Sequence, residues 1–232
     1  MLRYLPFLLA IAYGLVVWRF SMWRTKAELD ARSTELIDPG LRPLMERMAR
    51  ALDLPRLRVF LYDIQPVNGL AAPDGRIFLT RGFYDRYLAG EVTAAELASV
   101  VAHELGHVAL GHTRRRMIDF SGQNAVRMAL AAVLGRILPG IGVWLANLVT
   151  TMLAAHLSRT DEFEADAYAT ALLLKAGIGA GPQLSLFEKL DRLTGGGGPV
   201  PAWLLTHPKT ADRIAAIQAN ARKWAPGSLP NP

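Results

Sequence analysis

The sequence contains no cysteine. This absence excludes a disulfide framework and any metal site built on thiolates, so a metal bound by this chain must be held by nitrogen and oxygen atoms. It leaves the compartment open, because a protein without cysteine tolerates both oxidising and reducing surroundings. No internal repeat is visible either, so nothing in the sequence points to a repeat array.

The chain is also short of negative charge, with 26 lysines and arginines against 20 acidic residues and a net charge of +6. A basic balance can indicate nucleic acid or anionic lipid as a partner. The densest basic cluster, residues 114–116, has no interleaved aromatic residues and no nucleic-acid-binding motif beside it. We therefore expect membrane lipid as a partner and no nucleic acid. A solvated helix end explains this cluster equally well.

Residues 4–18 carry no charged side chain, and Arg19 is followed by Phe20 and Trp23. The run is short for a membrane span, but no small-residue cleavage site follows it, and aromatic residues beside arginines are typical of a membrane interface. We predict an uncleaved, single-span anchor over residues 1–23. By the positive-inside rule, the basic residues after it place the rest of the chain on the cytoplasmic side of the membrane, with the periplasmic side as the alternative.

Residues 93–116 have the pattern of one helix. Thr93 followed three positions later by Glu96 predicts a capping box at its start. Apolar residues then recur at helical spacing and predict a buried face. They are Leu97, Val100, Val101, Leu105 and Val108.

The same helix contains the motif HELGH at residues 103–107. Positions i and i+4 of a helix project from the same face, so His103 and His107 can bind one metal ion, and two neutral histidines at this spacing form half of a zinc site. Glu104 is placed to take a proton from water beside the metal, as in metal-dependent peptide hydrolysis. We expect one zinc ion per chain, and a surface helix with unrelated histidines is the alternative.

A catalytic zinc site has three protein ligands, and the acidic run at residues 158–166 supplies the third. Glu162 and Asp166 are four positions apart on a second helix, whose alanines permit close packing. Glu162 can bind the metal while Asp166 accepts the ring N–H of a histidine ligand. Glu164 is a rival ligand that faces another side, and a solvated acidic surface is the alternative explanation.

The two helices, together with His207-Pro208 and the later Arg213-Ile214, resemble a known family. This is the membrane-associated zinc metallopeptidase family, of the gluzincin type, that includes HtpX, BepA and the Oma-type and CAAX-prenyl-type proteases. The similarity spans roughly residues 38–223. It implies that the metal ligands are His103, His107 and Glu162, that Glu104 is catalytic, and that Asp166 supports a ligand.

The expected fold is α+β and predominantly α, with a zincin-like metallopeptidase core, a small β-sheet beside the active-site helix and the N-terminal anchor helix. Residues 24–37 are expected as a connector, residues 38–225 as the metallopeptidase domain and residues 226–232 as a tail. Strand patterns occur at residues 58–64 and 76–80.

Residues 124–157 form the most hydrophobic interior segment. Two full spans would leave too few residues to finish one metal helix and start the next. We therefore expect a membrane-facing insertion of two helices that pack over the site. A transmembrane hairpin is the alternative.

Residues 67–72 lie between the two strand patterns. The family resemblance implies an edge strand beside the cleft, where Asn68, Gly69, Leu70 and Ala71 would bind an extended substrate backbone. A simple β-turn connector is the alternative.

The sequence thus predicts a membrane-anchored zinc endopeptidase that cleaves unfolded or misfolded membrane polypeptides in protein quality control. His207, Arg213 and Tyr168 are candidates for stabilising the developing oxyanion. Glycines at residues 195–198 also suggest that His207 can reach the open metal position and hold the enzyme latent. The alternatives are a membrane-anchored, chaperone-like binding protein with a structural or latent zinc site, and a small-molecule metallohydrolase.

Overall fold

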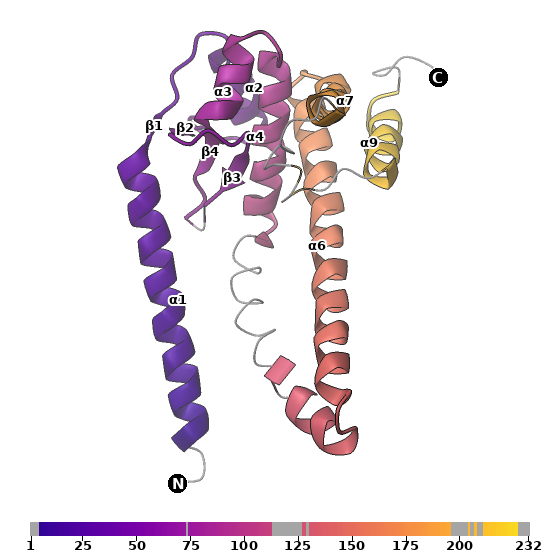
Figure 1. Ribbon diagram of the computed structural model, residues 1–232. Coiled ribbons are helices and arrows are strands. Elements are labelled where there is room, and N and C mark those ends of the chain that lie inside the picture. The colour runs from indigo at the N-terminus through magenta and orange to yellow at the C-terminus, as the bar shows by residue number, and fades with distance from the viewer. Residues whose placement is uncertain are drawn as a thin grey trace. The chain divides into compact units, whose positions relative to one another are not determined.

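The computed structural model describes residues 5–72, 74–112, 127–128, 130–195, 204, 207 and 211–226. The helices, shown in Figure 1, are α1 (Leu5–Arg32), α2 (Arg42–Ala51), α3 (Arg81–Leu88), α4 (Ala94–Ala109), α6 (Gly142–Lys175), α7 (Gly181–Gly195) and α9 (Ala211–Trp224). The strands are β1 (Ser33–Glu35), β2 (Val59–Tyr62), β3 (Gly69–Ala71) and β4 (Ile77–Thr80). The predicted α+β, mostly helical class is confirmed.

The described chain divides into two compact units. One unit contains Met1–Ala31 and Gly111–Thr160, and the other contains Arg32–Leu110 and Asp161–Pro232. Helix α6 begins in the first unit and ends in the second. It is continuous because residues 143–176 contain neither glycine nor proline to interrupt it. The hydrophobic insertion and the second predicted metal helix therefore share one helix.

The second unit contains a mixed sheet with strand order β1-β2-β4-β3. Strand β2 pairs in parallel with β4, while β1 and β3 pair antiparallel at the two edges. The strands predicted at residues 58–64 and 76–80 are confirmed as β2 and β4. Residues 69–71 form an edge strand and not only a turn, and the expected connector at residues 24–37 forms the end of α1 and β1 instead.

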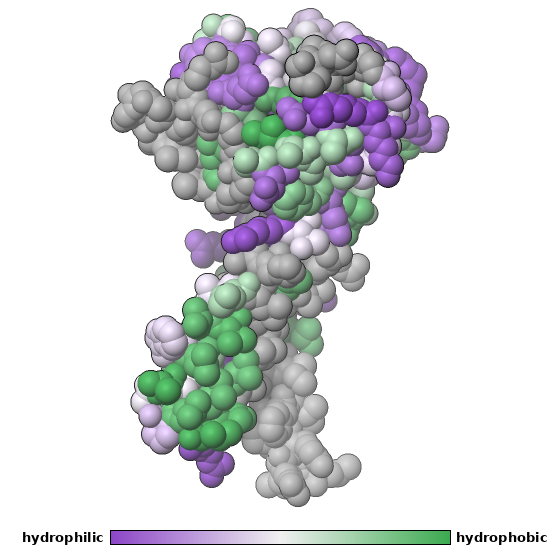
Figure 2. Space-filling model, turned by 90° about the vertical axis from the view of Figure 1, so that its right-hand side faces the viewer, coloured by the Kyte–Doolittle hydropathy of each residue, from purple (hydrophilic) through white to green (hydrophobic). Residues whose placement is uncertain are grey.

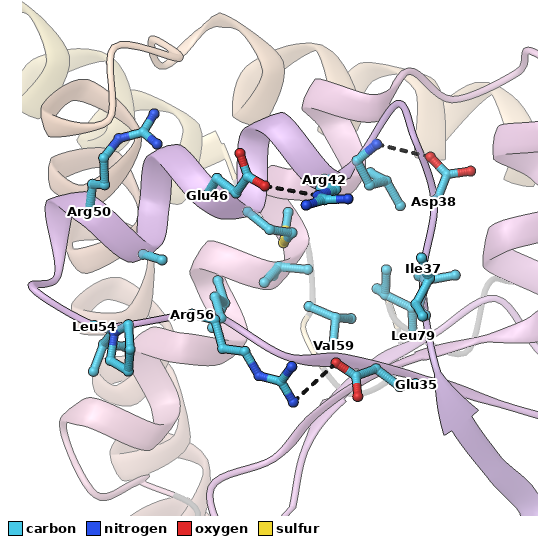
Figure 3. Close-up of a pocket in the computed structure, with 17 residues that line it drawn as sticks. Glu35, Ile37, Asp38, Arg42, Glu46, Arg50, Leu54, Arg56, Val59 and Leu79 are labelled. Carbon is cyan, nitrogen blue, oxygen red and sulfur yellow. Dashed lines mark hydrogen bonds and ion pairs between the residues drawn. The ribbon is translucent and has the colours of Figure 1, made fainter.

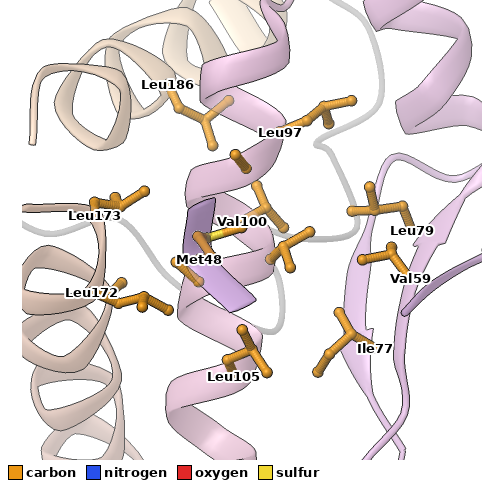
Figure 4. Packing of buried hydrophobic residues seen from close by; sticks show 14 of the residues in the cluster. Met48, Val59, Ile77, Leu79, Leu97, Val100, Leu105, Leu172, Leu173 and Leu186 are labelled. Atoms are coloured by element: carbon orange, nitrogen blue, oxygen red, sulfur yellow. The ribbon is translucent and has the colours of Figure 1, made fainter. Parts of the chain in front are cut away.

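Helix α4 packs between the sheet and helices α6 and α7 (Figure 4). Four residues of its predicted apolar face are buried and Val108 is partly buried, as the helical spacing indicates. Burying one such side chain contributes roughly 1.5–3 kcal/mol, so this interface is a main source of the unit's stability. The partners of α4 in the core include Met48, Ile77, Leu79, Leu172, Leu173 and Leu186.

The start of α4 has the predicted capping box. The hydroxyl of Thr93 accepts a hydrogen bond from the Glu96 backbone N–H at 3.2 Å, and the Glu96 carboxylate accepts one from the Thr93 N–H at 2.7 Å. The same carboxylate accepts hydrogen bonds from Lys189 and Ser185 of α7. The helix ends at Ala109, before the predicted end at residue 116, and the basic cluster at residues 114–116 lies outside the described residues.

The predicted membrane anchor lies in α1, whose helix covers most of residues 1–23. Across the described part of the chain, however, no helix combines the length and the apolar character that a membrane crossing requires. The single-span anchor predicted over residues 1–23 is therefore not supported, and part of the segment of the alternative transmembrane hairpin lies outside the described residues. The first unit nevertheless exposes large hydrophobic side chains, among them Phe20, Trp23, Ile137, Trp144, Val149 and Met152. Hydrophobic surface is visible in the lower part of Figure 2.

Candidate metal centre

The two histidines of HELGH lie one turn apart on α4 and are both buried. Their Nε2 atoms are 3.1 Å apart, and their rings meet edge to face. Two ring nitrogens this close together can bind the same metal ion. His103 and His107 therefore converge as the helical spacing predicts.

Glu162 of α6 completes this group. Its Oε2 atom lies 3.4 Å from His103 Nε2, and its Oε1 atom lies 3.5 Å from His107 Nε2. Around a tetrahedral zinc ion with bonds of about 2.0–2.1 Å, neighbouring ligand atoms are about 3.3 Å apart. The observed separations of 3.1–3.5 Å fit a single zinc ion.

Close packing of α4 on α6 brings Glu162 to the histidines. A Cβ atom at Gly106 would lie 3.0 Å from both the Cα and the carbonyl oxygen of Ala165. The absence of a side chain at Gly106 therefore lets the two backbones approach. Glu164 of the same helix is exposed and does not belong to the buried group that contains His103, His107 and Glu162.

Asp166 supports His103, one turn further along α6. The distance from His103 Nδ1 to Asp166 Oδ1 is 2.9 Å, and both side chains are buried. A carboxylate can only accept, so His103 donates from Nδ1, which leaves the Nε2 lone pair for a metal. The sequence predicted this role for Asp166 from its spacing to Glu162.

Arg213 of α9 is buried beside both carboxylates. Its Nε and Nη2 atoms donate to Asp166 at 2.6 and 2.9 Å, and its Nη1 lies 3.2 Å from Glu162 Oε2. Its guanidinium also lies 5.1 Å from the ring centroid of Phe187. All three guanidinium nitrogens therefore contact the two carboxylates, which points to positioning of these groups and away from the predicted oxyanion contact.

Charge keeps the acidic groups of the centre ionised. Burial raises the pKa of Glu162, but hydrogen bonds with His103 and His207 and the charge of these rings outweigh it and hold the pKa well below its usual range. Burial lowers the pKa of His103, but its contacts with Asp166 and Glu162 outweigh this effect and raise the pKa to about 9. The Glu162 carboxylate is thus ionised and able to bind a cation, and a metal bound at His103 Nε2 would displace the proton that the raised pKa places on this ring.

Glu104 is buried, and its Oε1 atom has no hydrogen-bond donor. A buried carboxylate oxygen without a hydrogen bond is costly, and this oxygen is therefore suited to accept a proton from water. Glu104 also lies beside strand β3, because a Cβ at Gly69 would be 3.6 Å from Glu104 Cγ. The candidate catalytic carboxylate and the candidate substrate strand, residues 68–71, are therefore neighbours.

His207 comes from a distant part of the chain and is buried in the same cluster. Its Nδ1 atom lies 2.9 Å from Glu162 Oε2 and 3.3 Å from His103 Nε2, and its Nε2 atom lies 3.4 Å from Glu104 Oε1. The ligand atoms of these histidines and Glu162 form a group of metal-binding size. His207 thus stands where a fourth ligand would bind, and most of the glycine run at residues 195–198 lies outside the described residues.

Sequence reasoning missed the polar groups behind Asp166. Thr170 and Gln183 are buried and donate to the Asp166 backbone carbonyl at 2.8 and 3.3 Å. They connect α6 to α7, and no local motif marks them because they come from different helices.

Tyr168 is partly buried against the core, and burial raises the pKa of its hydroxyl, which keeps it a hydrogen-bond donor.

Comparison with known proteins agrees with this geometry. Residues 35–221 match the model of Peptidase family M48. The chain is 34% identical over 158 residues to the metalloprotease LoiP of Escherichia coli (strain K12), covering 68% of this chain and 60% of LoiP. It is 25% identical to the protease HtpX of Pseudomonas aeruginosa over 91% of this chain and 84% of HtpX. It is 30% identical to the mitochondrial metalloendopeptidase OMA1 of Arabidopsis thaliana over 68% of this chain, but spans only 30% of that relative.

Proposed function

Because the chain belongs to peptidase family M48, we propose that it is a zinc-dependent endopeptidase. His103, His107 and Glu162 are the proposed zinc ligands and Glu104 the proposed general base. The observation that carries the proposal is the convergence of Glu162 on the histidine pair, 3.4 and 3.5 Å from their Nε2 atoms, beside a buried Glu104 oxygen that lacks a donor.

Each side chain then has a defined task. When bound, zinc polarises the scissile carbonyl and makes water more acidic. Glu104 accepts a proton from water and returns it to the leaving amine. Asp166 fixes the ring of His103 through the 2.9 Å hydrogen bond, and Arg213 fixes Asp166 and Glu162 through its guanidinium.

Replacement of Glu104 by glutamine tests this function. Glu104→Gln keeps the size of the side chain but removes the base, so we expect casein cleavage to fall by about 100-fold or more while zinc content is unchanged. The exposed Glu188→Gln of α7 is the matched control and keeps full activity. Equal cleavage by both variants would exclude Glu104 as the base.

The proposed substrate is an extended, unfolded polypeptide that adds a strand to β3. The Asn68 carbonyl accepts a hydrogen bond from the Thr80 N–H, and the Ala72 N–H donates one to the Arg76 carbonyl. Hydrogen-bonded and non-hydrogen-bonded pairs alternate along an antiparallel ladder, so the backbone N–H and C=O groups of Gly69 and Ala71 point away from β4. Ala71→Pro would remove one outward N–H and keep the β4 pairing. We expect KM for long peptides to rise while the melting temperature stays close to that of the wild type. An unchanged KM would contradict strand addition.

We further propose that His207 is an inhibitory fourth ligand. A site closed by four ligands has no position for substrate, and His207 Nδ1 lies within 3.3 Å of two other proposed ligand atoms. If His207 holds the enzyme latent, His207→Ala increases cleavage. Unchanged rate and unchanged zinc affinity would exclude a role at the metal.

The closed set of four ligands also favours a second candidate, a chaperone-like binding protein with a structural zinc site. This candidate predicts that His207→Ala loses zinc without gaining activity, and that Glu104→Gln prevents aggregation of an unfolded client as well as the wild type does. Cleavage by the wild type that Glu104→Gln abolishes would reject it.

Quality control of misfolded membrane proteins remains our proposal for the biological role, and a proteome comparison between cells with the wild type and with Glu104→Gln tests it.

We also propose contact with membrane lipid, supported by the exposed hydrophobic side chains of the first unit. Flotation with liposomes tests this contact, and protease protection in oriented vesicles distinguishes a cytoplasmic from a periplasmic catalytic unit.

A further inference from the structure

A second concave site lies in the same unit, separate from the metal centre. It is a pocket of about 400 Å³ between helix α2 and the segments at residues 35–38 and 54–57 (Figure 3). None of the residues proposed to bind zinc lines it. Its volume falls in the range of about 300–1,000 Å³ in which proteins bind small molecules.

The inner wall of the pocket is aliphatic. It consists of side chains from α2, the sheet and α4, including Leu41, Met45, Ala49, Val59, Leu79 and Val101. Among the described residues that line it, no buried side-chain nitrogen or oxygen lacks a hydrogen-bond partner. A polar occupant such as a peptide backbone or a sugar would therefore lose its hydrogen bonds there, and the buried part of a ligand must be apolar.

The carboxylates at the rim already have donors. Glu35 accepts two hydrogen bonds from Arg58, at 3.1 and 2.7 Å. Glu46 accepts from Arg42 at 2.9 Å. Asp38 accepts from two backbone N–H groups and two tyrosine hydroxyls. A cationic ligand would therefore have to compete with these donors for the rim carboxylates.

Two arginines that line the pocket have guanidinium donors to spare. The side chain of Arg50 on α2 is exposed and makes no hydrogen bond or ion pair with any described residue, and in Figure 3 it is directed away from Arg56. Arg56, on the facing segment, reaches Glu35 only at 3.6 Å, which is longer than a hydrogen bond. The exposed Ile37 and Leu54 flank the opening with further apolar surface.

We propose that this pocket binds an aliphatic monocarboxylate, such as a medium-chain fatty acid. The hydrocarbon chain fills the space beneath α2, and the carboxylate lies at the mouth, where the exposed side chains of Arg56 and Arg50 rotate to donate to it. Arginine is well suited to this contact because its planar fork matches a carboxylate. Val101 of the inner wall is on α4, two residues before His103, so the ligand contacts the helix of the metal centre.

Titration calorimetry of the full chain with dodecanoate, below the concentration at which it forms micelles, tests the proposal. We expect saturable binding of one molecule per chain and at least ~10-fold weaker binding of dodecan-1-ol, which lacks the charge. The double variant Arg50→Glu/Arg56→Glu weakens dodecanoate binding by at least ~10-fold. Arg222→Glu, an exposed arginine on α9, is the control and leaves it unchanged.

Ala49→Phe fills the pocket from α2 and abolishes binding. Its melting temperature is measured in parallel, and the two exposed arginines provide the decisive test if this variant does not fold. Absence of saturable binding, or equal affinity in the double variant and in Arg222→Glu, overturns the proposal. Tighter binding of acetyl-Leu-Leu than of dodecanoate also overturns it, because the site would then belong to a peptide terminus.

Discussion

Arg213 holds two carboxylates of the metal centre with one planar group. A lysine at this position would keep the positive charge but could not contact both acids in the same geometry. We expect Arg213→Lys to lower zinc affinity by about 10–100-fold, since groups that orient metal ligands contribute this much. Competition with a zinc-binding dye measures the affinity, and Arg222→Lys on the same helix is the control. Equal zinc affinity in both variants would show that Arg213 does not position the ligands.

Asp38 gives the fold a dependence on acid pH. Burial raises its pKa, but hydrogen bonds from two backbone N–H groups and from Tyr84 and Tyr87 outweigh burial and lower it from 3.8. A pKa that is lower in the folded state stabilises the protein above the unfolded value of about 3.9, and this contribution disappears as the pH falls through the folded pKa. We expect Asp38→Asn to lower the melting temperature at pH 6 and to have a much smaller effect at pH 3. Equal effects at both pH values would contradict this account.

Individual residues of the centre were predictable to different degrees. Helix geometry fixes the faces of His103 and His107 and of Glu162 and Asp166, so spacing alone indicated that each pair acts together. The partners of Arg213 were not predictable, because nothing local to α9 indicates that its guanidinium reaches the α6 carboxylates. The sequence suggested an oxyanion role, whereas the observed contacts favour positioning.

At the scale of elements, the metal centre depends on how closely α4 packs against α6. A Cβ at Gly106 would press on backbone atoms of Ala165, which cannot rotate away. We expect Gly106→Ala to destabilise the unit by about 1–3 kcal/mol through overpacking and to weaken zinc binding, because Glu162 moves with its helix. Calorimetric unfolding and zinc titration measure both effects. Ala109→Ser adds one atom at an exposed position of the same helix and serves as the control.

Helices and strands were predicted where neighbouring residues determine them, and they were missed where pairing with a distant segment determines them. The capping box of Thr93 and Glu96 marked the start of α4 correctly. Strand β1 is three residues long and forms through its pairing with β2, so residues 33–35 carry no pattern of their own. The sequence of residues 69–71 was equally compatible with a turn. These residues form edge strand β3 because they pair with β4.

At the scale of the whole molecule, zinc would join segments that are distant in the chain. The proposed ligands lie on α4, on α6 and at His207, all within one unit. Because an unfolded chain lacks this site, zinc binding contributes to folding. We expect a strong chelator to lower the melting temperature of this unit by several degrees in the wild type and in Glu104→Gln. His107→Ala should already melt low and respond little. Scanning calorimetry of the three proteins would reject a bound zinc if the chelator has no effect in any of them.

The division into two units could not be inferred from composition. Residues 1–31 and 111–160 form one unit although the second unit's residues separate them in the chain, and hydropathy does not report such grouping. The uncharged run in residues 4–18 suggested a membrane span from its hydropathy alone. That run lies in α1, and among the described residues no helix combines the length and the apolar character of a span.

The donor atoms of the metal centre are nitrogen and oxygen throughout. Zinc sites with sulfur ligands release the ion when hydrogen peroxide or an alkylating reagent modifies the sulfur. Such reagents find no ligand to modify here, so treatment with peroxide should leave the zinc content intact. Cobalt(II) binds comparable nitrogen and oxygen sites, and its visible absorption would report directly on whether three or four protein ligands surround the ion.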